Sequence, residues 1–386
     1  MTVAMTTNRQ SLRFEALDSW RGLCALWVVL YHFRAVSHAY DWLWVRTGDI
    51  AVDFFFVLSG FVLTHAYGEG LNSTAARWQF LIRRIGRLYP LHLVTLGAVL
   101  LLELARWTAT LATGSSLGRP AFTGDTDIWA LPANVLLIHA LGMFRDFTWN
   151  IPSWSISIEW TLCVVFVATS IVRRPLLTAS LLVTVGFLTT LWMSTLDWYP
   201  PEGHTAFIRG VYGFFLGALV YRLFDFLRAR KVSLPGWLEW IAPALLAATV
   251  LFKHWQIPVI PPLLFGALVL IFAAQAGPLS GALKQRVLSY LGEISYSIYL
   301  VHYVLVLVAF GVASVLEAVL GIDALTERGP FKAAVINMPN AWVGDFAALA
   351  FLGLTIMVAG VTYRWIENPG RRWFNDLLKK VPAPRS

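Results

Sequence analysis

The sequence predicts an all-α polytopic membrane protein that forms one membrane-embedded domain over residues 1–386. Three observations lead to this fold class. Of the 386 residues, 58% are hydrophobic and only 13% are charged, whereas roughly a quarter of the residues in soluble domains are charged. Apolar windows of about 20 residues follow one another along the chain, each long enough to span a bilayer as a helix. The basic residues cluster between these windows in a way that sorts them to one side of a membrane.

About ten transmembrane helices are expected, with both termini in the cytoplasm. Their predicted positions are 17–37, 50–68, 88–106, 154–172, 176–196, 206–227, 237–252, 258–276, 288–318 and 343–366. In this arrangement most Lys and Arg residues lie on the cytoplasmic side, where positive charge accumulates in membrane proteins. No cleavable signal peptide is expected before the first span, and no fused soluble domain is expected after the last one.

The segment WALPANVLLIHALGMF, residues 129–144, needs a separate interpretation. It is apolar, but it is short for a span and contains Pro132, Asn134 and His139. If it crossed the membrane, the basic clusters before and after it would require opposite orientations. We therefore expect a re-entrant or interfacial helix near 129–144, inside an outer-side loop over 107–153.

The net charge of +8 would suggest a nucleic-acid partner in a soluble protein. In a polytopic membrane protein it indicates contact between cytoplasmic loops and anionic lipids. Membrane lipids are therefore expected partners, and nucleic acid is not. The histidines include no pair at metal-ligand spacing, so no metal site is expected.

The first predicted helix carries two ionisable residues, Arg21 and His32, in the stretch SWRGLCALWVVLYHF. Eleven residues of helix amount to three turns plus about 20° and to roughly 16 Å of rise, so both side chains share one face. Ionisable groups within a membrane are costly and usually functional. The alternatives are a lipid-facing anchor for Arg21 and a structural interhelical hydrogen bond for His32. Asp18, one turn before Arg21, is expected to pair with it.

Three further ionisable residues are expected at the depth of His32, towards the outer leaflet. Asp53 lies about one turn into the second span, Glu159 about two turns into the fourth, and His302 roughly 20 Å into the ninth. A histidine beside carboxylates is the usual arrangement for proton transfer. We expect Asp53 or Glu159 to orient the imidazole of His32.

The basic stretch RRIGRLYP, residues 83–90, is expected at the depth of Arg21. Arg84 and Arg87 are three residues apart and therefore neighbours on a helical face, and Arg83 adjoins them. Planar guanidinium groups suit phosphate binding. The alternative is contact with lipid headgroups. A basic entrance joined by a three-turn helix to a histidine site fits a donor with a phosphate-rich head and a long thin arm, such as acyl-coenzyme A.

These residues occur in motifs that resemble the acyltransferase-3 family of integral membrane O-acyltransferases. The resemblance covers roughly residues 14–373, nearly the whole chain. The motifs are LDSWRGLCALWVVLYHF with its arginine, ten residues and histidine; VDFFFVLSGFVLTHAYG at 52–68; the R-x-x-R pattern in RRIGRLYPLH; SWSISIEW at 153–160; GEISYSIYLVH; and IENPGRR. Each motif alone is weak, but six in this order are specific.

The resemblance implies transfer of an acyl group, most often acetyl, from acyl-coenzyme A to a hydroxyl of a glycan or lipid-linked sugar. It also implies a bacterial-type plasma (inner) membrane, with a cell-surface or exported polysaccharide or a glycoside as acceptor. Arg21, His32, Arg84 and Arg87 carry over as functional positions, and Glu159 does so less firmly. The family often has a second acidic residue where this chain has Trp160, so a two-carboxylate role there is not expected.

We expect His32 to act as the general base that takes the proton of the acceptor hydroxyl. A relay through an acyl-histidine is the alternative. His302, Trp154 and Asn150 are candidates for an acceptor or proton network, since tryptophans of the loop WNIPSW could stack on sugar rings. A proton-coupled transporter of a sugar- or acid-like solute is the rival function. It would predict an internal repeat, and the sequence shows none.

Overall fold

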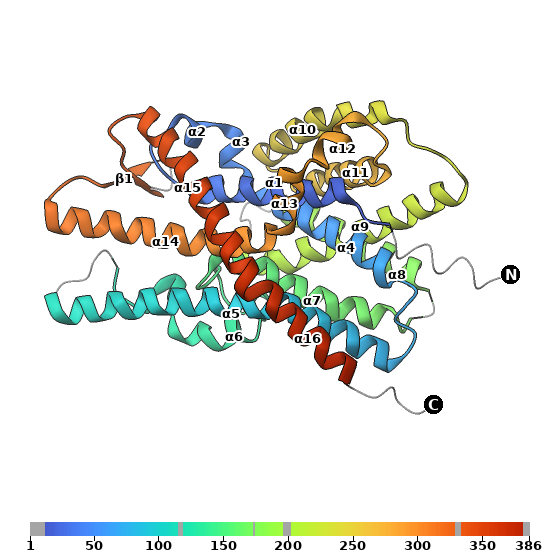
Figure 1. Cartoon of the computed structure of the whole chain (residues 1–386), viewed down its shortest axis with the longest axis horizontal. Coiled ribbons are helices and arrows are strands. Elements are labelled where there is room, and N and C mark those ends of the chain that lie inside the picture. The colour runs from blue at the N-terminus through green and yellow to red at the C-terminus, as the bar shows by residue number, and fades with distance from the viewer. Residues whose placement is uncertain (1–11, 115–118, 173, 196–201, 329–332, 381–386) are drawn as a thin grey trace.

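The apolar segments fold as helices, because a helix satisfies its own backbone hydrogen bonds within a bilayer. The computed structural model describes residues 12–114, 119–172, 174–195, 202–328 and 333–380. Within these residues, eight helical segments are long and apolar enough to cross a membrane. The expected all-α polytopic membrane fold is therefore confirmed (Figure 1).

Each of the ten predicted spans has a helical counterpart. Those in the eight long apolar segments are α4 (Ala51–Tyr67), α5 (Thr74–Thr113), α7 (Trp154–Thr169), α8 (Pro175–Ser194), α9 (Glu202–Ala229), α10 (Ala242–His254), α14 (Ser295–Leu320) and α15 (Ala341–Thr362). The other two are α1 (Glu15–His32), which carries three charged residues, and the shorter α11 (Ile260–Ala274). The remaining α-helices in the described part of the chain are α2 (His38–Asp41), α3 (Leu43–Arg46), α6 (Leu131–Val135), α12 (Pro278–Leu283), α13 (Arg286–Glu293) and α16 (Asn368–Lys380).

Helix α5 is much longer than the predicted span over 88–106. It begins at Thr74, where the Ser73 side chain caps it by accepting a hydrogen bond from the Ala76 backbone N–H at 3.1 Å. The helix then continues through Pro90 to Thr113. The basic stretch at 83–90 is therefore helical, and the structure fixes the directions of its arginines.

The predicted span over 288–318 is two helices. Helix α13 ends at Glu293 and α14 begins at Ser295, while α13 packs along α1. The backbones approach closely at two glycines, since a Cβ on Gly292 would lie 2.2 Å from the Asp18 carbonyl oxygen and one on Gly22 would lie 2.6 Å from the Leu291 carbonyl carbon. This contact places the start of α14 beside Arg21.

The expected helix near 129–144 is only partly present. Helix α6 covers Leu131–Val135, and turns occupy the residues after it. Pro132 begins this short helix, and Leu137 has a positive φ of 55°, which a continuing helix does not allow. A short antiparallel hairpin of β1 (Leu325–Arg328) and β2 (Ala333–Ile336), which the sequence did not indicate, joins α14 to α15.

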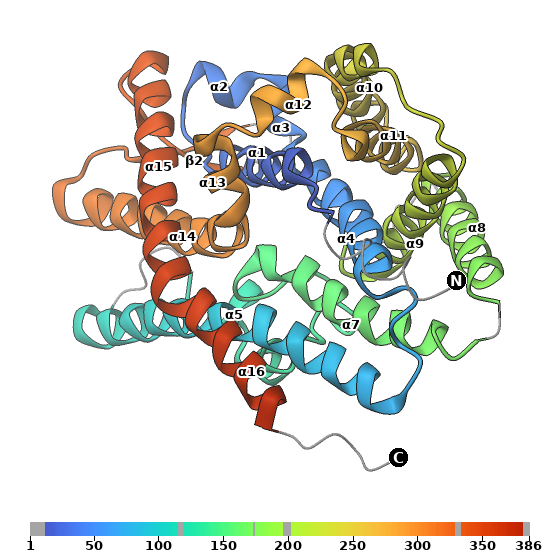
Figure 2. The same cartoon turned by 45° about the vertical axis from the view of Figure 1, so that its right-hand side comes forward.

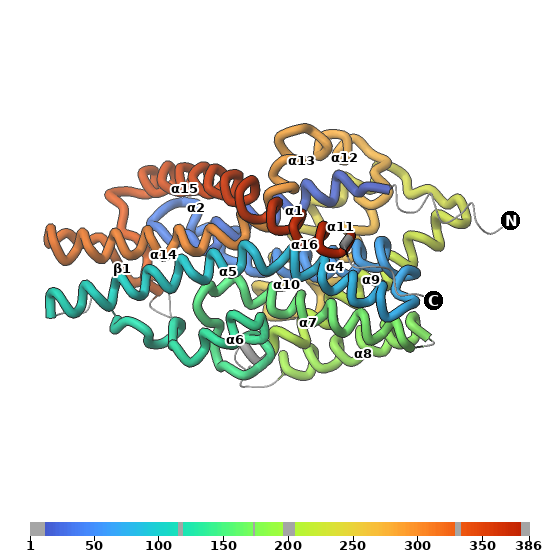
Figure 3. Tube along the Cα trace, turned by 60° about the horizontal axis from the view of Figure 1, so that its bottom comes forward, coloured from blue at the N-terminus to red at the C-terminus, as the bar shows by residue number. Residues whose placement is uncertain are grey.

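Five helices surround the centre of the bundle. Figure 1 shows α14 and α5 side by side, and α16 lies across α5 in Figures 1 and 2. The tube in Figure 3 shows α1, α4, α5 and α14 with broadly aligned axes. Together with α7, these helices position the candidate site.

Candidate active site

A cleft of about 800 Å³, including its open mouth, lies between α1, α4, α5, α7 and α14. Arg21, Arg84, Arg87 and Glu159 all line it. Side chains from α1, α5 and α7, which are far apart in the sequence, therefore meet in one place. Three guanidinium groups and one carboxylate give this part of the cleft, which we call the arginine level, an excess of positive charge.

Arg21 is fixed by three polar groups. Its Nε donates to Ser295 Oγ at 2.8 Å, its Nη2 donates to the Gly292 carbonyl at 2.7 Å, and its Nη1 lies 3.3 Å from Asp18 Oδ1. The pair expected between Asp18 and Arg21 is thus formed. These contacts hold the guanidinium at the wall of the cleft.

Arg84 and Arg87 differ in their partners. Arg84 forms an ion pair with Glu159, whose Oε1 also accepts from Ser59 Oγ at 3.4 Å. Arg87 lines the cleft and makes no hydrogen bond or ion pair with any residue that the structure describes. Its guanidinium donors are therefore available to an anion in the cleft. Arg83 is exposed and lies outside the cleft, because adjacent helical residues point about 100° apart.

His32 and His302 form a histidine pair. His302 Nε2 lies 3.2 Å from His32 Nδ1, while the two Nδ1 atoms lie 3.0 Å from the Val28 carbonyl and 3.2 Å from the Ile298 carbonyl. A carbonyl oxygen only accepts, so both Nδ1 atoms carry hydrogen and His302 Nε2 accepts from His32. The lone pair of His32 Nε2 then has no partner among the described residues.

The expectation that a carboxylate orients His32 differs from the structure. Asp53 Oδ1 instead accepts from Arg209 Nε at 2.6 Å, and Glu159 pairs with Arg84. Each carboxylate has an arginine on a neighbouring helix, and a buried charge is stabilised most by such a partner. The imidazole of His32 is oriented by His302 and by its own helix.

Tyr299 lies between the cleft and the histidine pair. It lines the cleft, its ring centroid is 6.0 Å from that of His302, and it contacts Phe55 edge-to-face at 5.6 Å. Its hydroxyl donates to the Pro152 carbonyl at 3.0 Å and lies 2.8 Å from Ser155 Oγ. Neither histidine lines the cleft itself. The Tyr299 ring therefore forms part of the wall that separates the arginine level from His32.

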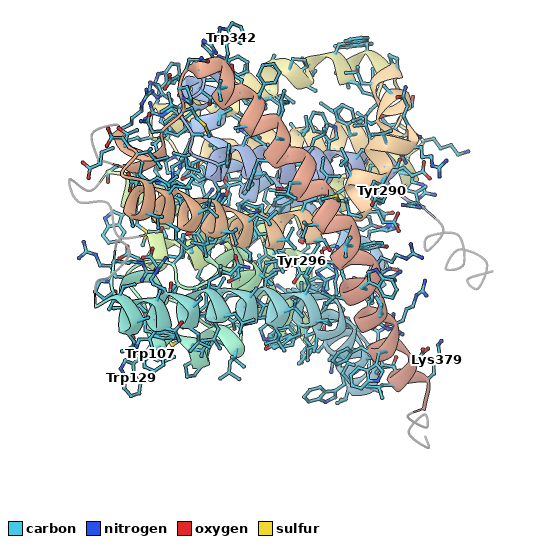
Figure 4. All side chains as sticks on the ribbon, turned by 60° about the vertical axis from the view of Figure 1, so that its left-hand side comes forward. Trp107, Trp129, Tyr290, Tyr296, Trp342 and Lys379 are labelled. Atoms are coloured by element: carbon cyan, nitrogen blue, oxygen red, sulfur yellow. The ribbon has the colours of Figure 1, made fainter. Side chains whose placement is uncertain are left out.

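Two predicted acceptor residues are buried. Trp154 stacks on Phe147, with ring centroids 4.7 Å apart, and the Arg209 guanidinium carbon lies 5.8 Å from the centroid of the Trp154 ring. Asn150 donates to the Leu300 carbonyl at 3.2 Å. Because Trp154 is buried among these contacts, it has no exposed face for a sugar ring, while the Asn150 Oδ1 is buried without a hydrogen-bond partner among the described residues. The exposed tryptophans are at the periphery, and Figure 4 labels Trp107, Trp129 and Trp342 there, with Tyr296 in the interior.

The comparison with protein families identifies the chain. A family model described as an acyltransferase domain matches residues 14–364, nearly the whole sequence. The chain belongs to the acyltransferase-3 family. The match is to an acyltransferase domain, which favours acyl transfer over the rival transporter.

Three curated relatives illustrate this acyltransferase's family. The chain is 25% identical to the peptidoglycan O-acetyltransferase OatA of Listeria monocytogenes, over 95% of this chain and 57% of OatA. It is 26% identical to the acyltransferase MdmB of Streptomyces mycarofaciens, over 87% of this chain and 84% of MdmB. It is 27% identical to the putative peptidoglycan O-acetyltransferase YrhL of Bacillus subtilis, over 74% of this chain and 48% of YrhL. The chain thus spans about half the length of OatA and YrhL. No solved structure shows significant similarity to this acyltransferase.

The sequence interpretation missed several residues of the candidate site. Ser295 and Tyr299 share a face of α14 with His302, since they are seven and three residues before it. That spacing within GEISYSIYLVH could have identified them. Arg209 is an ionisable residue within a predicted span, which is itself a sign of a buried partner. No group of three or more potential ligand residues in the described part of the chain could hold a metal ion.

Proposed function

We infer that this acyltransferase moves an acyl group, most simply acetyl, from acyl-coenzyme A to a hydroxyl of a glycan or glycoside. The observation that carries this proposal is the cleft that joins Arg21, Arg84 and Arg87 to a wall adjoining the histidine pair. Arginine forks bind phosphate oxygens through paired charge-assisted hydrogen bonds. A donor with a phosphate-rich head and a thin arm matches a site of this shape.

The reaction follows from the free lone pair on His32 Nε2. This atom takes the proton of the acceptor hydroxyl while the hydroxyl oxygen forms a bond to the thioester carbonyl carbon. The carbon–sulfur bond then breaks, and the leaving thiolate of coenzyme A takes the proton back from the imidazolium. If Nε2 attacks the thioester first, the same atom becomes the nucleophile of an acyl-histidine relay.

The proposal includes an orientation in the membrane. Acyl-coenzyme A is a cytoplasmic metabolite, so the arginine level faces the cytoplasm and the acceptor approaches His32 from the opposite side of a bacterial inner membrane. Relatives named as peptidoglycan O-acetyltransferases support a cell-surface glycan as the acceptor class.

The test uses radiolabelled acetyl-coenzyme A and membranes from cells that express the protein. Wild-type membranes should transfer label to the polysaccharide fraction. His32→Ala should lower this transfer by roughly 10²- to 10⁴-fold, the usual contribution of a general base, while the purified variant still binds coenzyme A. Near-normal transfer by His32→Ala at equal expression would exclude His32 as base or nucleophile. Label retained on wild-type protein and absent from His32→Ala would favour the relay.

A further inference from the structure

His32 has an open side outside the cleft. It does not line the cleft, yet it is only partly buried, and its Nε2 keeps accessible surface without a hydrogen-bond partner among the described residues. The Tyr303 ring packs against the His32 ring edge-to-face, with centroids 5.6 Å apart. Most of Tyr303 is buried, but its hydroxyl also keeps accessible surface and has no hydrogen-bond partner in the described part of the chain. A basic nitrogen and a hydroxyl are therefore available beside each other.

This open side lies away from the arginine level. Tyr303 is eight residues after Ser295 on α14, which amounts to about 12 Å of helical rise. The loop that carries Asp125 is joined to the far part of α5, because a backbone N–H of that loop donates to Glu103 Oε2 at 2.9 Å. Glu103 is 16 residues, or about 24 Å of rise, beyond Arg87. An acceptor that approaches His32 from the side opposite the donor therefore reaches this part of the molecule.

Two charged side chains, Arg34 and Asp125, belong to the open side. The Tyr303 hydroxyl interacts electrostatically with both, and they interact with each other. Arg34 also interacts with His32, and its guanidinium carbon lies 6.0 Å from the centroid of the Phe310 ring on α14. Neither Arg34 nor Asp125 makes a side-chain hydrogen bond or an ion pair with a residue that the structure describes. Their donors and acceptors are therefore available to a ligand.

A third cation near Asp125, Arg119, is held by other groups. Its Nη2 lies 3.2 Å from Glu103 Oε1, and its Nη1 donates to the Thr123 carbonyl. Since Arg119 has these partners, the unpaired guanidinium beside Tyr303 is that of Arg34.

We propose that Arg34, Asp125 and Tyr303 form the acceptor subsite, where they bind the hydroxyl groups of a sugar unit and present one of them to His32 Nε2. This inference rests on the proposed function. A carboxylate accepts hydrogen bonds from sugar hydroxyls, while a guanidinium and a phenolic hydroxyl donate to sugar oxygens. A sugar unit presents several hydroxyls at once, so it can engage all three side chains, whereas a lone hydroxyl engages only one.

The experiment measures acyl transfer by the purified full-length protein from radiolabelled acetyl-coenzyme A. The acceptor is surface polysaccharide of the source cells, from which mild alkali has removed the O-acyl groups. Arg34→Ala and Asp125→Asn should each raise KM for the polysaccharide by roughly 10-fold or more, the effect of losing a hydrogen bond to a charged group. Tyr303→Phe should raise it by about 2- to 10-fold, because its hydroxyl is neutral. Asp125→Glu, which keeps the carboxylate, should recover much of the affinity.

The matched controls are Arg83→Ala and Asp376→Asn, which remove the same charges at exposed positions of α5 and α16. They should leave KM for the polysaccharide unchanged. Every variant should keep wild-type affinity for coenzyme A in calorimetry, since the three subsite residues lie outside the cleft. An unchanged KM for the polysaccharide in Arg34→Ala or Asp125→Asn, or a loss of coenzyme A affinity in either, would overturn the proposal. If the wild-type protein binds coenzyme A but transfers no label to the polysaccharide, the proposed function itself fails.

Discussion

His302 Nε2 lies 3.2 Å from His32 Nδ1, on the same ring nitrogen that lies 3.0 Å from the Val28 carbonyl. His302 donates its own Nδ1–H to a carbonyl of α14, so its Nε2 can only accept. The Val28 carbonyl and His302 Nε2 therefore share the one Nδ1–H of His32, which holds the proton on Nδ1 and leaves the reactive lone pair on Nε2. In a catalytic triad, an acidic side chain orients the histidine base. Here the side chain in that role is a second imidazole.

Replacing His302 tests this positioning role. His302→Leu should lower kcat by about 10- to 100-fold, less than the 10²- to 10⁴-fold expected for loss of the base itself. KM for acetyl-coenzyme A should stay unchanged, because His302 lies outside the cleft. His302→Gln should restore most of the rate, since its amide oxygen can accept from His32 Nδ1. Equal losses of kcat in the leucine and glutamine variants would contradict the positioning role.

Arg87 should account for a large share of donor affinity, because its donors are unpaired among the described residues. Hydrogen bonds to charged groups contribute about 1.5–3 kcal/mol, so Arg87→Ala should weaken coenzyme A binding by roughly 10- to 100-fold. Arg87→Lys should recover part of it, because lysine keeps the charge and loses the planar fork. Arg83→Ala is the control, since Arg83 is exposed outside the cleft. Calorimetric titration with coenzyme A measures each effect, and equal losses in the Arg83 and Arg87 variants would contradict the assignment.

The sequence was sufficient for the fold class and for the three arginines of the cleft, Arg21, Arg84 and Arg87. Apolar windows identify membrane helices because the bilayer imposes their length and composition. The phase of a helix places Arg21 and His32 on one face, and the spacing of Arg84 and Arg87 makes them neighbours. Helical periodicity and depth are local properties, which is why they can be predicted from one sequence.

The ion-pair partners of the buried carboxylates could not be predicted in the same way. Depth placed Asp53 and Glu159 near His32, but the actual partners depend on which helices pack side by side. Helix α9 brings Arg209 to Asp53, and the long α5 brings Arg84 to Glu159. The contact between the Phe55 and Tyr299 rings depends equally on the relative positions of α4 and α14, which no single helical pattern specifies.

Glu159 is expected to position Arg84 and to take no part in proton transfer. Its carboxylate is paired with Arg84 and bonded to Ser59 in the cleft, away from the histidine pair. Glu159→Gln should keep a hydrogen bond to Arg84 while losing the ionic attraction. We therefore expect weaker coenzyme A binding, by roughly 10-fold, with kcat changed less than about threefold. A kcat loss as large as that of His32→Ala, at saturating donor, would instead place Glu159 in the chemical step.

The pair of Asp53 and Arg209 should contribute to stability more than to chemistry. Their 2.6 Å contact joins α4 to α9, and Asp53 is buried while Arg209 keeps some exposure. Removing one member of such a pair leaves an uncompensated charge and costs about 3 kcal/mol, the lower end of the range for buried pairs. Asp53→Ala and Arg209→Ala should each lower the thermal unfolding temperature in detergent. The double variant should be more stable than the sum of the two effects predicts, because neither charge then remains alone. Additive losses of stability in the two single variants and the double variant would contradict this role. So would a fall in kcat for Asp53→Asn with no change in its unfolding temperature, which would show that Asp53 acts on the reaction and not on the packing of α4 against α9.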